Sequence, residues 1–252
     1  MLAEALKAAG YATGCIGKWH LGFLPGMRPM DQGFDSYYGV LHNLDKFETV
    51  MFGKEGGMPF LRGDAVVARP AEPAQMTALY TAEALQFIER HRDQPFFLYL
   101  AHAMPHLPLD ASPKFKANRR AACMQMWWKS WMTARGRLST NSAVSGWRKS
   151  RSSFSPSDNG PERSTPGTAA PLRGTKHTVF EGGLRVPFLA WWPGKVPAGR
   201  VSSDFMTALD LLPTLARLAG TSLPNDRPSD GLDASAQFLG ETGAHHLRER
   251  LY

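Results

Sequence analysis

"GYATGCIGKWHLG", residues 10–22, is the stretch that decides how this chain folds. Its first part, YATGCIG at 11–17, has the pattern of a short buried strand, and Lys18 and His20 follow where that strand ends. A lysine and a histidine two positions apart, between glycines, can bind an anion at a strand end. The alternative is an ordinary solvated strand end that binds nothing.

Helical and wholly apolar segments alternate on both sides of this strand. Helices are predicted over 2–9, 73–92 and 205–220, and strands buried on both faces over 95–106 and 186–192. Residues 25–70 are rich in glycine and proline, and we expect mostly loop with short elements there. The alternation predicts an α/β fold with a mostly parallel, mixed sheet flanked by helices.

Length and composition exclude some classes of protein. The chain has 252 residues, of which 43% are apolar, so it can bury a sizeable core. It has no run of eighteen apolar residues, which predicts no membrane span. Its first residues lack a secretory leader pattern and open directly into a helix, so we expect preceding chain to be missing. The two cysteines fit neither a disulfide framework nor a metal-ligand spacing.

The net charge of +7 comes from one tract. Ten lysines and arginines, and no acidic residue, lie between Asp110 and Asp158, and the other 19 basic residues are outnumbered by 22 acidic ones. Residues 117–156 within this tract also hold four of the seven tryptophans. One interpretation is a basic, aromatic surface that binds nucleic acid.

The genetic code offers another interpretation of this tract. Back-translating it and shifting the frame by one base permits the string RG-x-YADVVEELDDS, which has the pattern of an acidic amphipathic helix. We therefore hypothesise that residues 117–156 are translated out of frame within a single partial domain over 1–252. The parent DNA tests this, since a read without compensating insertions and deletions would contradict it.

Three groups of residues outside the tract could carry chemistry. The first is Lys18 with His20, the second is His106 after the apolar run, and the third is Asp158 and Asn159 with Lys176. Ligands of open α/β sheets gather at the carboxyl ends of strands, where all three groups are expected. Lysines neutralise a tetrahedral anion, histidines transfer protons, and carboxylate and amide oxygens bind a hard divalent cation.

The opening stretch resembles the second signature of the sulfatases, in which G-Y-x-T runs into G-K-W-H-x-G. The resemblance continues in family order through these segments: DQGFDSYYG, QPFFLYLAHAMPHLPL, SDNGP, PLRGTKHTVFEGGLRVPFLAWWPGKVPAG and ALDLLPTLARLAG. It covers nearly the whole chain, is interrupted only at 117–156, and is strongest to arylsulfatases and the N-acetylgalactosamine-6-sulfatase group. It implies the sulfatase core fold, which is alkaline-phosphatase-like.

The resemblance implies a role for each of the six residues. Lys18 and Lys176 match the lysines that bind the sulfate oxygens. His20 matches the histidine beside the nucleophile, and His106 matches the histidine near the leaving-group oxygen. Two further matches are to calcium ligands: Asp158 and Asn159. The implied activity is hydrolysis of aryl or carbohydrate sulfate esters through a formylglycine nucleophile.

The chain also departs from the family pattern. The acidic pair that completes the calcium site and the C-x-P-x-R motif whose cysteine becomes formylglycine are both missing. Neither Cys15 nor Cys123 is followed by the required residues. The chain stops before the small C-terminal domain of the family. We therefore expect an incomplete calcium site and no turnover from this chain alone.

Several alternatives stay open at this stage. A phosphodiesterase or phosphonate hydrolase of the same superfamily would use the same cationic residues, and a non-catalytic basic binding fragment would use the 117–156 tract. The resemblance implies a sulfated small molecule or glycan as partner, no nucleic acid, and a periplasmic or extracellular location. His102, His177 and Asp210 are more simply interpreted as structural residues.

Overall fold

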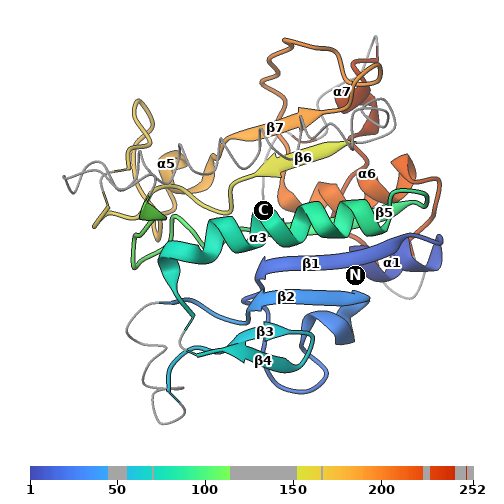
Figure 1. Ribbon diagram of the computed structural model, residues 1–252. Helices are drawn as coiled ribbons and strands as arrows, with labels where there is room; N and C mark the ends of the chain where they lie inside the picture. Colours follow the sequence, from blue (N-terminus) through green and yellow to red (C-terminus); the bar gives the residue numbers. More distant parts are fainter. Residues whose placement is uncertain are drawn as a thin grey trace. The chain divides into compact units, whose positions relative to one another are not determined.

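The structure is a computed structural model of the chain, drawn in Figure 1. It describes residues 1–44, 56–69, 71–113, 152–165, 167–223, 228–241 and 248. The chain divides into two units: Met1–Ala143 with Met206–Ser235, and Val144–Phe205 with Ala236–Tyr252.

The first unit is built on a five-stranded mixed sheet with the strand order β4-β3-β2-β1-β5. Its strands are β1 (Ala12–Lys18), β2 (Ser36–Val40), β3 (Phe60–Arg62), β4 (Ala65–Ala68) and β5 (Phe96–Ala101). β1 pairs in parallel with both β2 and β5, whereas β3 and β4 pair in antiparallel fashion. The three parallel strands therefore end at one edge of the sheet, and Lys18 lies on that edge.

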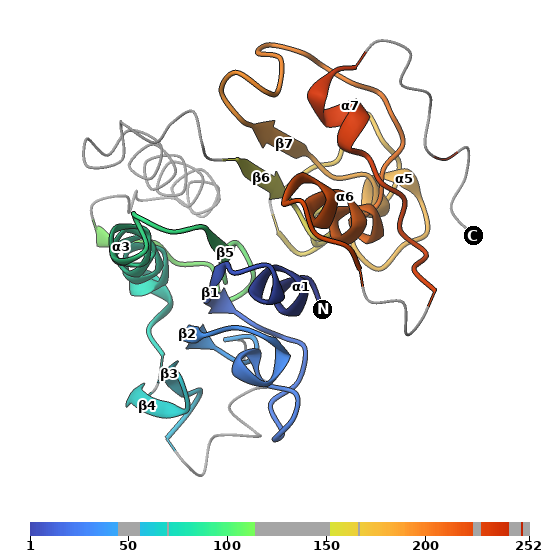
Figure 2. The same cartoon turned by 90° about the vertical axis from the view of Figure 1, so that its right-hand side faces the viewer.

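Helices cover both faces of this sheet. They are α1 (Leu2–Ala8), α3 (Pro73–Arg90), α6 (Leu211–Leu218) and the 3₁₀ helices η1 (Pro29–Gln32) and η5 (Ala208–Asp210). Figure 2 shows α3 and α1 on opposite sides of β1 and β5. Side chains of a strand alternate between faces, so Ile16 packs in the core that includes α3, and Cys15 in the core that includes Ala3 of α1.

The second unit holds a two-stranded antiparallel sheet. Its elements are β6 (Ser153–Pro156), β7 (Phe188–Trp191), α5 (Glu181–Leu184) and α7 (Ser235–Leu239). Three phenylalanine rings pack together: Phe238 lies 5.2 Å from Phe154 and 5.5 Å from Phe188 between ring centroids. These rings join α7 to both strands.

The structure confirms the elements that have a clear sequence period. The helix expected over 2–9 is α1, the strand after it is β1, and the helix expected from Pro73 is α3. α3 forms because its apolar residues recur every three or four positions. They bury one stripe against the sheet through Met76, Tyr80, Ala84 and Phe87.

The strand over 95–106 differs from the expectation. It is β5, six residues long, and it is half-buried rather than buried on both faces, with 42% of Tyr99 exposed. The reason is position, because β5 ends the order of the described sheet and a continuous apolar run indicates two covered faces only for an inner strand. β7, within the run 186–192, is similarly exposed at Leu189.

Two further segments refine the sequence interpretation. The region 25–70, expected to be mostly loop, supplies the inner strand β2. The helix expected over 205–220 begins with η5 and continues as α6. Asp210, which is fully buried, accepts a hydrogen bond from the Thr207 backbone N–H (2.8 Å) and supports this start. Asp210 is therefore a structural residue.

Most of the tract 117–156 lies outside the described residues. Its last four residues form β6, and the hypothesis of a shifted frame stays a prediction. Cys123 also lies outside the described residues. In the part of the chain that is described, no helix has both the length and the apolar character that crossing a membrane requires.

Candidate functional site

Lys18 and His20 stand where two parallel strands end together. Lys18 is the last residue of β1 and pairs with Val40, the last residue of β2. The pairing continues beyond both strands, because the Trp19 N–H donates to the Val40 carbonyl (3.0 Å) and the His20 N–H to the Leu41 carbonyl (2.9 Å). The backbone therefore holds this pair in register with the segment after β2.

Trp19 lies between Lys18 and His20 and holds this part of the backbone in place. Its side chain is 4% exposed and packs in the core with Cys15, and its Nε1–H donates to the Met27 carbonyl (2.8 Å). Side chains alternate along β1, so Lys18, two residues after Ile16, falls on the α3 side of the sheet. The buried Trp19 anchors the backbone between Lys18 and His20.

His20 has an unusual backbone and a histidine neighbour. Its φ of 57° is left-handed, a conformation that costs a residue with a side chain about 1 kcal/mol and that clusters at functional sites. Its ring lies against that of His42, with centroids 4.2 Å apart and planes 55° apart. The sequence interpretation missed His42, because it did not identify β2 as a strand parallel to β1.

His106 follows the carboxyl end of β5, the other parallel neighbour of β1. Its backbone N–H donates to the Ala103 carbonyl (3.3 Å), and its Nδ1 lies 2.9 Å from the Leu107 carbonyl oxygen. A carbonyl only accepts, so Nδ1 carries a hydrogen in this contact, and Nε2 is the ring nitrogen that can exchange a proton. The topology brings His106 to the same sheet edge as Lys18 and His20.

His102 lies closer to β5 but has a different environment. Its ring is 6.1 Å from that of Tyr80, and its Nδ1 is buried without a partner among the described residues. Burial lowers the pKa of His102 to about 4, so the ring is neutral near pH 7. This supports the structural role expected for it.

The second unit brings Asp158 and Asn159 next to the loop of Lys176. The Lys176 N–H donates to the Pro161 carbonyl (2.9 Å), which ties the two loops together. Only glycine fits at position 160, because a Cβ there would collide with the Gly182 carbonyl oxygen.

A second set of bonds shapes the turn that carries Lys176. The Thr178 hydroxyl donates to the Thr175 carbonyl (2.7 Å) and accepts from the Thr175 N–H (3.2 Å). The side chain of His177 is 75% exposed and lies 3.4 Å from a Glu162 oxygen. These observations support the interpretation of His177 as a surface neighbour of Lys176.

The oxygens of Asp158 and Asn159 are the ligand type that calcium prefers. Asp158 is exposed and Asn159 is half-buried, so both can be reached from solvent. Within the described ranges, no three or more His, Cys, Asp or Glu residues come together where they could hold a metal ion. Calcium takes six or more oxygens, so these two residues fit a calcium site only in part.

The six predicted residues thus form two groups. Lys18, His20 and His106 belong to the first unit; Asp158, Asn159 and Lys176 belong to the second. Backbone pairing places Lys18 and His20 at the carboxyl edge of the sheet, His106 follows the carboxyl end of the neighbouring strand β5, and a loop contact joins the segments of Asn159 and Lys176. That the two groups converge on one ligand stays a prediction.

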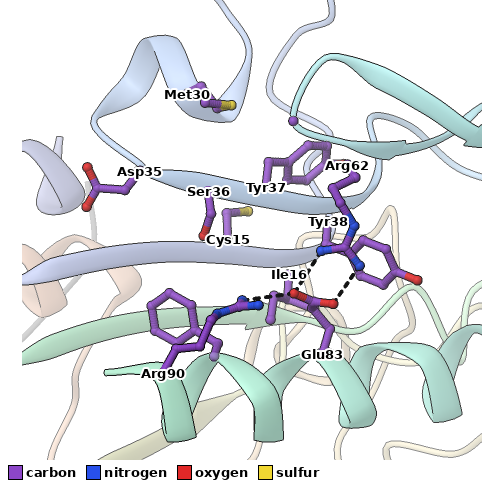
Figure 3. Close-up of a pocket in the computed structure, with 12 residues that line it drawn as sticks. Cys15, Ile16, Met30, Asp35, Ser36, Tyr37, Tyr38, Arg62, Glu83 and Arg90 are labelled. Atoms are coloured by element: carbon purple, nitrogen blue, oxygen red, sulfur yellow. Dashed lines mark hydrogen bonds and ion pairs between the residues drawn. The ribbon is translucent and has the colours of Figure 1, made fainter. Parts of the chain in front are cut away.

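A cavity of about 250 Å³ lies between α3 and the sheet in the first unit, and none of the six residues lines it (Figure 3). Three of its four charged side chains pair with one another, and the fourth, Asp35, pairs with Lys7 at 2.7 Å. Glu83, whose side chain is 7% exposed, accepts from Arg62 (2.7 and 3.0 Å) and from Arg90 (3.0 Å). Hydrogen bonds from Arg62 lower the pKa of Glu83 and outweigh its burial. This cluster joins α3 to β3 and is a structural feature.

Comparison with known proteins places both groups in one family. The sulfatase family model matches residues 1–140 and 154–221. N-acetylgalactosamine-6-sulfatase of Canis lupus familiaris is 36% identical over 95% of this chain and 48% of its own length. Arylsulfatase G of Mus musculus is 30% identical over 97% of this chain and 54% of its own length. The chain therefore spans about half the length of the curated relatives it matches.

Solved structures agree with this assignment. PsFucS1 sulfatase from Pseudoalteromonas sp. has a TM-score of 0.83 at 29% identity and covers 94% of this chain and 54% of its own. Ps i-CgsB has a TM-score of 0.82 at 29% identity, over 95% of this chain and 57% of its own. The phosphonate monoester hydrolase SpPMH from Silicibacter pomeroyi shares the fold alone. It has a TM-score of 0.62 at 16% identity and covers 95% of this chain and 61% of its own.

The fold is therefore the alkaline-phosphatase-like fold of these neighbours, with the mixed sheet and flanking helices predicted from the sequence. The family model covers most of the chain and includes all six predicted site residues. The chain belongs to the sulfatase family.

Proposed function

We propose that this chain carries the oxyanion-binding residues of a sulfuric ester hydrolase. One observation supports this most: the family match runs through both residue groups. Its first part contains Lys18, His20 and His106, and its second part contains Asp158, Asn159 and Lys176. No other residue sets need to be invoked for the anion or for the proton transfers.

The reaction needs charge stabilisation and proton transfer. A sulfate ester is negative at its terminal oxygens, and charge grows on the ester oxygen as the sulfur–oxygen bond breaks. In the proposal the ammonium groups of Lys18 and Lys176 bind the terminal oxygens. The protonated Nε2 of His106 donates to the leaving alcohol, and His20 exchanges the proton on the nucleophile side.

Formylglycine, which the family resemblance implies, would supply the nucleophilic hydroxyl. The described residues do not replace it. Cys15 is fully buried, and burial raises the pKa of its thiol, so it is a packing residue as expected and not a nucleophile. Asp158 and Asn159 would contribute two of the oxygen ligands of calcium, with the remaining ligands supplied from elsewhere.

Sulfated glycans are the substrate class that the relatives favour. Their names include an N-acetylgalactosamine-6-sulfatase, and Ps i-CgsB has been solved in complex with k-i-k-neocarrahexaose. We propose a sulfated sugar, with aryl sulfates as model substrates, and a periplasmic or extracellular location. Two half-buried lysines and the imidazoles of His20 and His106 would also accept a phosphate ester, so the test includes phosphate.

The experiment measures binding of inorganic sulfate to the purified chain by calorimetry. Lys18→Ala should raise the dissociation constant roughly tenfold, because it removes a charge-assisted contact. Lys195→Ala is the matched control, since Lys195 is an exposed lysine outside both groups. Equal affinity in the wild type and Lys18→Ala would contradict the proposal, and tighter binding of phosphate than sulfate would favour the phosphoryl alternative.

Turnover is measured on the same samples. We expect no hydrolysis of 4-nitrophenyl sulfate by the chain alone, because it contains no C-x-P-x-R motif. Hydrolysis at a rate that Lys18→Ala abolishes would show a nucleophile within this chain and contradict the formylglycine assignment.

A further inference from the structure

We propose that the cavity between α3 and the sheet of the first unit binds a small organic carboxylate, held by the guanidinium groups of Arg62 and Arg90. This inference does not rest on the proposed function, because none of the six predicted site residues lines the cavity. It is carried by three observations: the room that small side chains leave over β1 and β2, a net positive charge on one wall, and the apolar character of the other walls.

The cavity exists because two small residues lie side by side beneath α3. Gly14 of β1 pairs with Ser36 of β2, and Tyr38 packs against the core that includes α3. Side chains alternate along β2, so Ser36, two residues before Tyr38, falls on the same side. A Cβ at Gly14 would lie 2.4 Å from the Phe87 ring, so α3 passes directly over this position. The volume of about 250 Å³ that stays open beside it exceeds the roughly 30 Å³ share of one water molecule.

One wall of this cavity keeps a net positive charge. Figure 3 shows Glu83 between the two arginines, and it accepts two hydrogen bonds from Arg62 (2.7 and 3.0 Å) and one from Arg90 (3.0 Å). A single carboxylate therefore faces two guanidinium groups. The other acidic side chain among the described lining residues, Asp35, pairs with Lys7 at 2.7 Å. One positive charge is thus left over for a ligand.

Both arginines keep hydrogen-bond donors beyond those that bind Glu83. A guanidinium group stays protonated in proteins and has five N–H donors, of which Arg62 uses two on Glu83 and Arg90 uses one. About half of each arginine side chain is exposed. The Arg62 guanidinium also lies 4.3 Å from the centroid of the Tyr38 ring, which holds its plane in place. Donors that are held in place before binding lose less conformational freedom when a ligand binds.

The remaining walls decide which anion fits. Ile16 and Phe87 contribute apolar surface to the cavity, and the half-buried Ser36 contributes a hydroxyl that has no partner in the described part of the chain. A carboxylate with an apolar body would place its oxygens against the arginines and its body against Ile16 and Phe87. Inorganic sulfate or phosphate would leave these walls uncovered. The cavity is smaller than most drug-sized pockets, so a single-ring carboxylate such as benzoate is the appropriate probe.

This cavity is separate from the edge of the sheet that carries Lys18. Ser36 is the first residue of β2, whereas Val40, the partner of Lys18, is its last residue. A carboxylate bound beside Ser36 therefore lies at the opposite end of β2 from Lys18. Benzoate binding in the cavity should be independent of Lys18.

The test measures benzoate binding to the purified chain by calorimetry. Benzamide keeps the ring without the charge and acetate keeps the charge without the ring, so each should bind roughly tenfold more weakly than benzoate. Arg90→Gln should raise the dissociation constant of benzoate roughly tenfold, while Glu83 keeps both bonds from Arg62. Arg92→Gln is the matched control, because Arg92 pairs with Glu89 at 3.0 Å and lies outside the residues that line the cavity.

Nitrogen NMR of the arginine side chains provides a second readout that needs no variant. Benzoate should move the Nε–H signals of Arg62 and Arg90 and leave that of Arg92 in place. Absence of these shifts, equal affinity for benzamide, or unchanged benzoate affinity in Arg90→Gln would overturn the inference. Loss of benzoate binding in Lys18→Ala would place the anion at the carboxyl edge and overturn it as well. Displacement of benzoate by inorganic sulfate at equal affinity would overturn the assignment of a carboxylate.

Discussion

Trp19 shows how a single residue fixes the geometry of the pair around it. Its buried indole donates to the Met27 carbonyl (2.8 Å) and packs beside Cys15. Trp19→Phe keeps an aromatic ring but leaves that carbonyl without its donor, so it should lower the free energy of unfolding by about 1–2 kcal/mol. Urea denaturation followed by circular dichroism measures this change.

Trp192 provides the control for this substitution. Its Nε1 is buried without a partner among the described residues, so Trp192→Phe removes no hydrogen bond. We expect it to cost less than Trp19→Phe. Equal losses in the two variants would show that indole volume, and not the bond to Met27, accounts for the effect.

His102 should make stability depend on pH. Burial lowers its pKa in the folded chain to about 4, whereas an unfolded histidine titrates near 6.5. As the pH falls from 6.5 toward 4, the His102 side chain takes up a proton in the unfolded chain but stays neutral in the folded chain. The loss of stability across this window should therefore reach about 3 kcal/mol at most.

His102→Leu tests this contribution, because a leucine at the same buried position does not titrate. Urea unfolding at pH 7 and pH 5 should show a smaller difference in the variant than in the wild type. An unchanged difference would assign the pH dependence to other histidines. The comparison stops at pH 5 because the stabilisation from Glu83 is lost only below the pKa of an unfolded glutamate, near 4.5.

At the scale of elements, Glu83 joins α3 to β3. It is 7% exposed and accepts hydrogen bonds from Arg62 and Arg90. Glu83→Gln removes the charge that both guanidinium groups share, and we expect a loss of about 2 kcal/mol in the free energy of unfolding at pH 7. Because the pKa of Glu83 is lowered in the folded chain, this contribution is present above the pKa of an unfolded glutamate and is lost as the pH falls below it.

Glu89 on the same helix is the control for Glu83. Its carboxylate pairs with Arg92 at 3.0 Å, but both side chains are about half exposed. Exposed pairs contribute about 0–1 kcal/mol, so Glu89→Gln should change the free energy of unfolding by less than about 0.5 kcal/mol. Equal effects of the two substitutions would contradict the role given to Glu83.

Elements with a clear period could be predicted from the sequence, and elements defined by their neighbours could not. α3 follows from its apolar stripe, and β1 from its compact apolar run before Lys18. β2 lies in a segment whose glycines and aspartates are typical of turns, and it is a strand because it pairs with β1. β5 was expected to be covered on both faces, but strand order is a tertiary property that an apolar run does not encode.

The same distinction applies to the candidate site. Lys18, His20 and His106 could be proposed because they follow predicted strands and match family motifs. His42 could not, since its position depends on the unpredicted β2 and on a ring contact with His20. The ring nitrogens of His42 and His106 contact backbone groups that only the folded chain brings into place.

The predicted site residues of the whole molecule come from both units. Each unit has its own strands, and each carries one group of predicted residues. The family match runs through both, and the chain spans about half the length of its curated relatives. We propose, on the family resemblance, that Lys18 and Lys176 bind the same sulfate.

A double-mutant cycle on sulfate binding tests whether the two lysines contact one anion. The dissociation constant of inorganic sulfate is measured for the wild type, Lys18→Ala, Lys176→Ala and the double variant, with Lys18→Ala plus Lys195→Ala as the control pair. If both lysines contact one anion, the two losses should be non-additive by at least about 0.5 kcal/mol, whereas the control pair should be additive within about 0.3 kcal/mol. Additive losses in the Lys18 and Lys176 cycle would show two separate anion sites and contradict the account.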